Sequence, residues 1–158
     1  MIPSDHFVRF YNEVFKSLEE KGREHLEAYW HELGLLQRRE LEERFRKGGL
    51  QACYDYWSQI LEEEDCKGSV RLTEDFFEFD MERCPSLSKV QDNDATPSPH
   101  YCDHCPGWVD PVLRAAGLYP ANDIISRTEP RCIIRVYTDP QKAAEFEKSS
   151  VLPIHVEA

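Results

Sequence analysis

The densest group of chemically reactive side chains lies in residues 99–108, which read PHYCDHCPGW. The stretch holds two cysteines, two histidines and a tryptophan: Cys102, Cys105, His100, His104 and Trp108. Thiolates and imidazoles bind transition metals, exchange disulfides and act as nucleophiles and bases. Three chemistries are therefore open for this stretch: a metal site, a redox pair and a cysteine nucleophile.

A metal site would need ligands from more than one part of the chain. C-x2-C is a common half of a tetrahedral zinc site, because its turn directs both sulfurs at one ion. The chain has one such pair, so the other ligands must come from distant cysteines or from the histidines, at spacings that no standard zinc module has. If zinc binds, we expect as ligands Cys84, Cys102, Cys105 and His104, and a catalytic site with an open position is then one form it can take.

A redox pair of the thioredoxin type is the second chemistry. That motif places its first cysteine at a helix N-terminus inside a βαβ unit, where the helix dipole lowers the pKa of the thiol. Here Cys102 follows a proline-containing loop, and the pattern of the chain contains no βαβ unit. The sequence gives this chemistry the least support.

A cysteine nucleophile is the third chemistry, with Cys102 as the candidate. His100 and His104 each lie two positions from Cys102, and such a pair shares a side only in extended backbone. Either histidine is then a candidate base or proton donor, and the alternative is that both are solvated loop residues. Trp108 is a candidate wall of the pocket.

The first 65 residues predict helices that would support this stretch. Apolar residues at helical spacing follow Ser4 or Asp5 as N-cap, and Gly22 suits the C′ position. A second helix is expected over about 23–47, a break at Gly48-Gly49, and a third helix over about 50–64. Cys53 lies on the apolar stripe of the third helix, so we interpret it as a core residue.

The region 68–138 predicts an antiparallel sheet of two hairpins. Phe77, Phe79 and Met81 alternate with acidic residues that we expect on the solvated face of a strand: Glu78, Asp80 and Glu82. The second hairpin is expected over about 123–138. Between the hairpins we expect a mobile loop or lid over 86–100 and a short helix from Asp110 as N-cap to Gly117 as C′.

The whole pattern, with a last helix over 139–148, predicts one α+β domain covering residues 1–158. The formal net charge of −11 argues against nucleic acid as a partner. No apolar run reaches the roughly 18 residues of a membrane span, and the first residues do not resemble a secretory signal. We therefore expect a cytoplasmic protein whose six cysteines are thiols.

Four short motifs carry a resemblance to a known family. They are RCP at 83–85, HYC at 100–102, AAGLYP at 115–120 and RCII at 131–134, behind a helical N-terminal half. In this order they resemble the L-2-amino-thiazoline-4-carboxylic acid hydrolase family of small bacterial proteins. Cys84, Cys102 and Cys132 match the pattern, whereas Cys105 and His104 are additions of this chain.

The resemblance implies a hydrolase that opens a thiazoline ring at its amidine-like carbon. The nucleophile is then a cysteine thiolate or a metal-bound hydroxide, with His100 or His104 as proton donor and Cys132 at the substrate. A substrate carboxylate needs a cation, and Arg127 is the best candidate, because Arg131 and Arg135 lie on the opposite strand face from Cys132. The alternative is a protein that binds zinc or a small ligand without catalysis.

Overall fold

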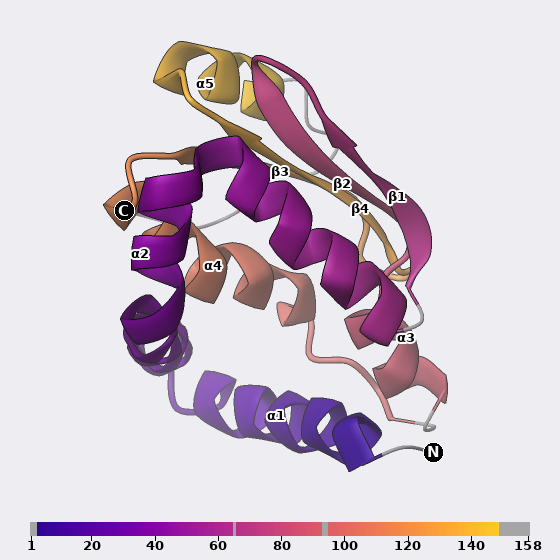
Figure 1. Cartoon of the computed structure of the whole chain (residues 1–158). Coiled ribbons are helices and arrows are strands. Elements are labelled where there is room, and N and C mark those ends of the chain that lie inside the picture. The colour runs from indigo at the N-terminus through magenta and orange to yellow at the C-terminus, as the bar shows by residue number, and fades with distance from the viewer. Residues whose placement is uncertain (1–2, 65, 93–94, 149–158) are drawn as a thin grey trace.

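The computed structural model describes residues 3–64, 66–92 and 95–148. The described helices are α1 (Pro3–Glu19), α2 (Arg23–Glu63), α3 (Pro85–Asp92), the 3-10 turn η1 (Tyr101–Asp103), α4 (His104–Ala115) and α5 (Pro140–Lys148). The strands are β1 (Lys67–Leu72), β2 (Phe76–Arg83), β3 (Tyr119–Ser126) and β4 (Arg131–Tyr137). A helical N-terminal part is followed by a sheet with interspersed helices, as Figure 1 shows, which confirms the α+β class.

The N-terminal helices follow the predicted pattern with one difference at the start. α1 begins at Pro3, so Ser4 and Asp5 lie inside the helix. The prediction that one of them is the N-cap is therefore wrong. α2 runs through the two predicted helices as one element with a kink at Gly49, where φ is 56° and ψ is −139°. Only glycine adopts such a backbone at little cost, so the predicted break is present as a change of direction.

The four strands form one antiparallel sheet in the order β1-β2-β4-β3. The second hairpin lies along the long strand of the first, and Met81 of β2 pairs with Cys132 of β4. Cys84 comes directly after β2, and its N–H donates to the carbonyl of Pro130 with an N···O distance of 2.6 Å. This register brings Cys84 and Cys132 to the same corner of the sheet.

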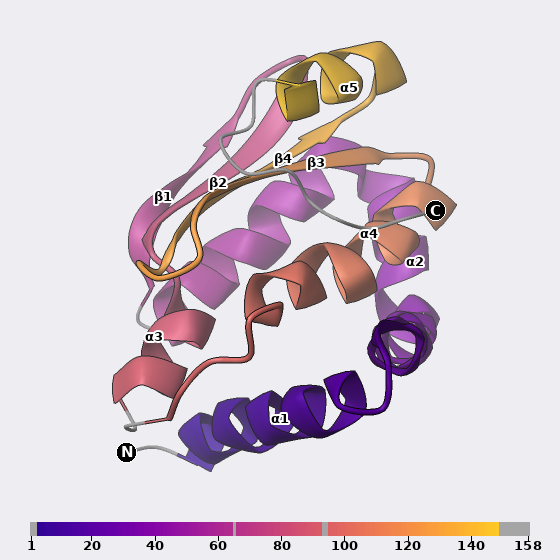
Figure 2. The ribbon, with the colours of Figure 1, turned by 180° about the vertical axis from the view of Figure 1, so that it is seen from behind.

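One face of the sheet packs on α2 and α4 and forms the main core (Figures 1 and 2). Trp57 of α2 stacks between Phe45 at 5.6 Å and Phe77 of β2 at 5.4 Å, measured between ring centroids. Burying each of these rings contributes about 1.5–3 kcal/mol. Cys53 is fully buried in the same cluster, which confirms its assignment to the core.

The opposite face of the sheet is less open to solvent than the alternation predicts. α5 packs there, with Ala143 and Phe146 against apolar residues of the strands. Glu78 is 8% exposed and lies between two arginines, Arg71 at 2.9 Å and Arg135 at 2.6 Å. The expectation of a solvated Glu78 is therefore wrong, since two ion pairs cover the carboxylate, whereas Glu82 is exposed as expected.

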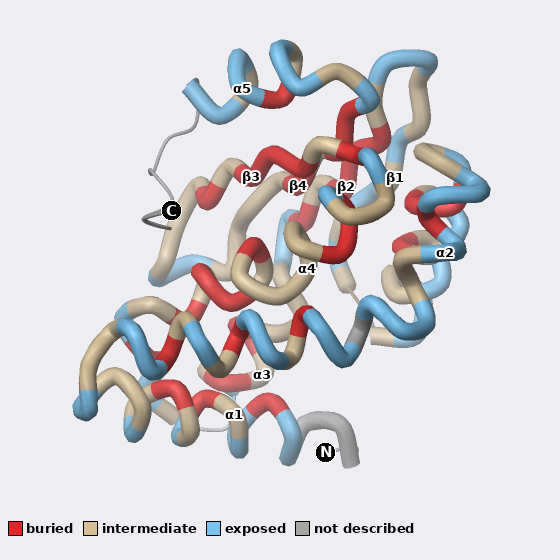
Figure 3. The backbone as a smooth tube through the Cα atoms, turned by 90° about the vertical axis from the view of Figure 1, so that its left-hand side faces the viewer, coloured by how far each residue is buried: buried red, intermediate tan, exposed pale blue. Residues whose placement is uncertain are grey.

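Two elements between the hairpins differ from the prediction. Residues 86–92 of the expected mobile loop lie in α3, whose Leu87 and Val90 are buried in a second core with α1. Figure 3 shows buried positions in α3 beside α1. α4 begins at His104 and not at Asp110, with Pro111 inside the helix, because the 3-10 turn before it supplies an earlier start. Gly117 has φ of 84°, as expected for a C′ residue.

Candidate functional site

Four cysteines from four different elements border one pocket. Cys84 follows β2, Cys102 lies in η1, Cys105 in the first turn of α4, and Cys132 in β4. The rest of the wall is mostly apolar, with Leu87, Pro106 and isoleucines of both strands of the second hairpin. Residues far apart in the chain therefore supply a single thiol-rich site, and we call it the thiol pocket.

The thiol pocket is small. The centre of a water molecule fits into about 20 Å³ of it, whereas pockets that hold small-molecule ligands usually measure roughly 300–1,000 Å³. The pocket therefore accepts a water-sized group, and a ring enters only if the lining side chains move apart.

Cys84 differs from the other thiols because it caps a helix. Its carbonyl accepts the first backbone hydrogen bond of α3, from the N–H of Ser88 at 3.1 Å, and Pro85 takes the first helical position. A hydrogen bond from the Cys132 thiol lowers the pKa of Cys84 to about 7, with further bonds from the backbone N–H groups of Leu87 and Ser86 and against the opposing effect of burial. Donors at a helix N-terminus stabilise an anionic sulfur, so Cys84 is partly a thiolate at neutral pH.

The other three thiols of the pocket stay protonated. Burial raises the pKa of Cys102 to about 12, with a further increase from the nearby Cys84 sulfur. Burial, followed by Cys84, also raises the pKa of Cys105. The bond to Cys84, in which Cys132 keeps its proton, raises the pKa of Cys132. Cys102, the nucleophile expected from the sequence, borders the pocket but lacks an activating environment.

His104 is buried and contacts Cys105, not Cys102. Its Nδ1–H donates to the carbonyl of Tyr101, and its Nε2 lies 3.4 Å from the sulfur of Cys105. Burial lowers the pKa of His104 to about 4. The imidazole is therefore neutral at pH 7, and its one N–H is bonded to a backbone carbonyl. His104 is thus not placed to act as the proton donor that the sequence suggested.

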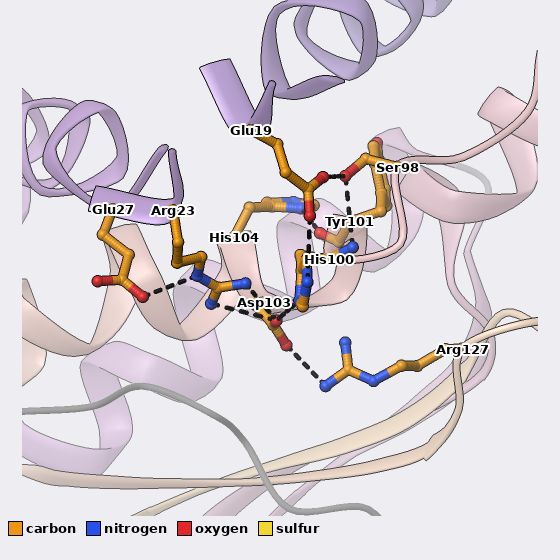
Figure 4. Close-up of polar contacts among 9 residues, drawn as sticks. All are labelled: Glu19, Arg23, Glu27, Ser98, His100, Tyr101, Asp103, His104 and Arg127. Carbon is orange, nitrogen blue, oxygen red and sulfur yellow. Dashed lines mark hydrogen bonds and ion pairs between the residues drawn. The ribbon is translucent and has the colours of Figure 1, made fainter. Parts of the chain in front are cut away.

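His100 belongs to a charged cluster next to the pocket, shown in Figure 4. Its Nδ1 lies 3.1 Å from Oδ2 of Asp103, and its Nε2 lies 3.1 Å from Oε1 of Glu19. Both ring nitrogens thus face carboxylates. Asp103 is fully buried and also pairs with Arg23 at 3.4 Å and Arg127 at 2.7 Å.

Arg127 carries a donor that the charged cluster leaves unused. Its Nη1 is buried and makes no hydrogen bond within the part of the chain that the structure describes. The guanidinium is close enough to Cys102 to oppose the rise in pKa that burial causes there. A buried N–H without an acceptor costs about 1–3 kcal/mol, which an anionic ligand at this atom would relieve, but Arg127 is not among the residues that border the thiol pocket.

The remaining residues predicted for the site lie elsewhere or have partners. Trp108 does not border the pocket, because its ring packs 4.4 Å from the ring of His104 in an aromatic group with α1. Arg131 borders the pocket but bonds to Asp80 and to the carbonyl of Met81. Arg135 pairs with Glu78 on the far face of the sheet.

One polar pair beside the pocket has no counterpart in the sequence prediction. Asn122 borders the pocket and donates its Nδ2–H to both carboxylate oxygens of Asp110, each at 3.3 Å. Burial raises the pKa of Asp110 to about 7, opposed by the bond from Asn122. The sequence places Asp110 before a proline, which suggests a helix cap, so nothing in the pattern points to this pair.

The sulfurs do not form a metal-binding group. Among residues 3–64, 66–92 and 95–148, no three side chains of His, Cys, Asp or Glu are arranged to hold a metal ion. The set Cys84, Cys102, Cys105 and His104 borders one pocket, but His104 directs its nitrogens at Tyr101 and Cys105. The donors present do not fit a zinc centre, so zinc stays a prediction of the sequence.

Comparison with protein-family models, with curated proteins and with solved structures gives no match to this chain. No helix of the described ranges combines the length and the apolar character that crossing a bilayer requires.

Proposed function

We propose that this chain is a small-molecule hydrolase with Cys84 as its nucleophile, acting on a thiazoline-type ring at the amidine carbon between nitrogen and sulfur. The observation that carries the proposal is the position of the Cys84 sulfur. It faces a mostly apolar pocket from a helix N-terminus, with a thiol and two backbone N–H groups donating to it. A thiolate held in this way attacks an electron-poor carbon.

The proposed reaction uses the two sulfurs of the corner in different roles. Cys84 bonds to the amidine carbon, and the bond between that carbon and the ring sulfur breaks. The Cys132 thiol supplies the proton for the departing sulfur, which leaves as a thiol. Water then attacks the carbon held on Cys84, returns a proton to Cys132 and frees the thiolate. His104 and Cys105 stay neutral and line the pocket.

Arg127 is the proposed anchor for a substrate carboxylate. Its buried Nη1 has no acceptor among the described residues, and its Nη2 is fixed by Asp103 at 2.7 Å. A guanidinium held in place on one side offers its free edge to a carboxylate. Because Arg127 itself does not border the thiol pocket, the proposal requires the pocket to open toward Arg127 when the ring binds.

A direct assay tests the proposal. Purified protein is incubated with 2-amino-thiazoline-4-carboxylate, and ring opening is followed by release of a thiol product. The expected result is turnover, together with a covalent adduct on the tryptic peptide CPSLSK, which begins at Cys84. Absence of both turnover and adduct, or an adduct on another cysteine, would contradict the proposal.

A second candidate is a protein that binds a ligand without catalysis. The small size of the pocket, about 20 Å³, favours a water-sized ligand over a ring, whereas zinc would require the donors to move, because no three of them are arranged to hold a metal ion among the described residues. Elemental analysis separates the two, because zinc at one ion per chain that resists dialysis supports a binding role. Protein without metal but with one highly reactive thiol supports the hydrolase.

The setting that we propose is the cytoplasm of a bacterium, with a small molecule as the partner. All six cysteines are free thiols in the structure, and free thiols persist in a reducing compartment. The net charge of −11 disfavours nucleic acid as a partner.

A further inference from the structure

We infer that Cys84 and Cys132 form a dithiol that reacts with a hydroperoxide and closes to a disulfide. The inference deepens the proposed function and rests on it in one respect, namely that Cys84 is the reactive thiol. It adds a second substrate class, small hydroperoxides, and a second chemical state of the site in which the nucleophile is blocked.

Cys84 and Cys132 lie at one corner of the sheet. Both border the thiol pocket and both pack against the main core, and each thiol shifts the pKa of the other. Their backbones are fixed there, because the Cys84 N–H bonds to the Pro130 carbonyl at 2.6 Å and Cys132 lies in the register of β4 opposite Met81. Disulfides form between cysteines whose Cβ atoms approach to about 3.5–4.5 Å, which is within reach of side chains on neighbouring backbone segments.

The size and lining of the thiol pocket suit a small hydroperoxide. The centre of a water molecule fits into about 20 Å³ of the pocket, and hydrogen peroxide is only slightly larger than water. Cys84 and Cys132 both border the pocket together with apolar side chains. A hydroperoxide therefore reaches Cys84 without the opening that a ring would need.

The other two thiols of the pocket are placed less well for pairing with Cys84. The Cys105 sulfur lies 3.4 Å from Nε2 of His104. Cys102 lies in the 3-10 turn before α4, whereas Cys84 and Cys132 both pack against the main core. Cys132 follows two residues after Pro130, whose carbonyl bonds to the Cys84 N–H, so it is the resolving residue.

The chemistry proceeds in two balanced steps. The Cys84 thiolate attacks one peroxide oxygen, the O–O bond breaks, and the second oxygen leaves as hydroxide or alkoxide that takes up a proton. Cys84 is then a sulfenic acid. The Cys132 thiol loses its proton and attacks the Cys84 sulfur, so that an S–S bond forms, the S–O bond breaks and water leaves. Two electrons pass from the two thiols to the hydroperoxide.

Peptide mapping after treatment with one equivalent of hydrogen peroxide tests the inference. Trypsin releases Cys84 in CPSLSK and Cys132 in CIIR, whereas Cys102 and Cys105 share the peptide 90–114. The expected product is CPSLSK joined to CIIR, with loss of two of the six thiols and reversal by dithiothreitol. A bond from Cys84 to the peptide 90–114, or six intact thiols, would overturn the inference.

Two variants make the result specific. Cys132→Ser should stop the reaction at the sulfenic acid, so that dimedone labels CPSLSK, and Cys102→Ser should form the same Cys84 to Cys132 bond as the wild type. Dimedone labelling of a different peptide in Cys132→Ser would contradict the order of the steps. Neither readout needs a thiazoline, so a disulfide without turnover would refute the hydrolase alone, and turnover without a disulfide would refute the dithiol alone.

Discussion

The main core and the thiol pocket each contain a cysteine, and the pKa of the thiol is shifted in opposite directions in the two regions. In the main core, Cys53 is fully buried among α2 and the sheet, and burial raises the pKa of its thiol to about 12. At the thiol pocket, Cys84 is half-buried, yet donors from Cys132, Leu87 and Ser86 lower the pKa of its thiol to about 7. The comparison teaches that the donors directed at a sulfur, and not its depth, decide whether it is a thiolate.

The largest effect that this comparison predicts is at Cys84. Cys84→Ser should reduce thiazoline hydrolysis by about 10³-fold or more, because a hydroxyl in the same position is a far weaker nucleophile at neutral pH. The melting temperature should change little, since a serine hydroxyl accepts the same hydrogen bonds at the α3 N-terminus. Activity that survives within tenfold of the wild type would place the nucleophile elsewhere.

The substrate anchor is the next effect in size. Arg127→Gln should raise KM by roughly 10–100-fold, the loss expected for a charge-assisted bond of about 1.5–3 kcal/mol to a carboxylate. Arg135→Gln is the matched control, because Arg135 pairs with Glu78 on the other face of the sheet, and its KM should be that of the wild type. Equal changes in both variants would contradict a specific role for Arg127.

The core cysteine should behave in the opposite way to Cys84. Cys53→Ala should lower the free energy of unfolding by about 1–3 kcal/mol, through lost contacts in the core, and should leave kcat and KM unchanged. Chemical denaturation and the hydrolysis assay on one preparation check both parts. Loss of activity in a variant of unchanged stability would mean that Cys53 takes part in the function.

A smaller effect is expected for the buried carboxyl beside the pocket. Burial raises the folded pKa of Asp110 from 3.8 to about 7, so the native state binds more protons than the unfolded state between these values. The native chain therefore loses stability as pH rises through this window. Asp110→Asn removes the charge, and its gain in unfolding free energy over the wild type should grow from near zero at pH 4 as the pH rises to about 7 and then level off. A gain that does not depend on pH would be evidence against a buried carboxylate.

Much of the architecture follows from local patterns in the sequence. Three features can be recognised within one segment each: the apolar stripes of α1 and α2, the break at Gly48-Gly49 and the alternation in β2. α3 is the exception, because its stability comes from Leu87 and Val90 packing on α1, a contact that no period within a polar, proline-containing segment reveals. The sequence also predicts the start of α4 too late. Asp110-Pro111 resembles a helix cap, but the 3-10 turn before His104 already begins the helix.

The sequence predicts part of the site and not the roles within it. Cys84, Cys102, Cys105 and Cys132 border one pocket, whereas His100, Trp108 and Arg127 do not. The choice among them depends on α3, because its N-terminus supplies the donors for Cys84, and the cysteine-proline step at 84–85 is the signal that marks such a cap. His104 contacts Cys105, and His100 contacts two carboxylates, those of Asp103 and Glu19. Glu19 is so far from His100 in the chain that spacing carries no information on the pair.

The most direct test of this account is the pH dependence of alkylation at each cysteine. Native protein is treated briefly with iodoacetamide at pH values from 5 to 10, and labelling is measured by mass spectrometry on CPSLSK, CIIR, 90–114 and the peptide that holds Cys53. The account predicts that CPSLSK is labelled first and that its rate reaches half of its maximum at about pH 7, whereas Cys53 is not labelled. A midpoint near 9 for Cys84, or faster labelling of Cys102, would contradict it.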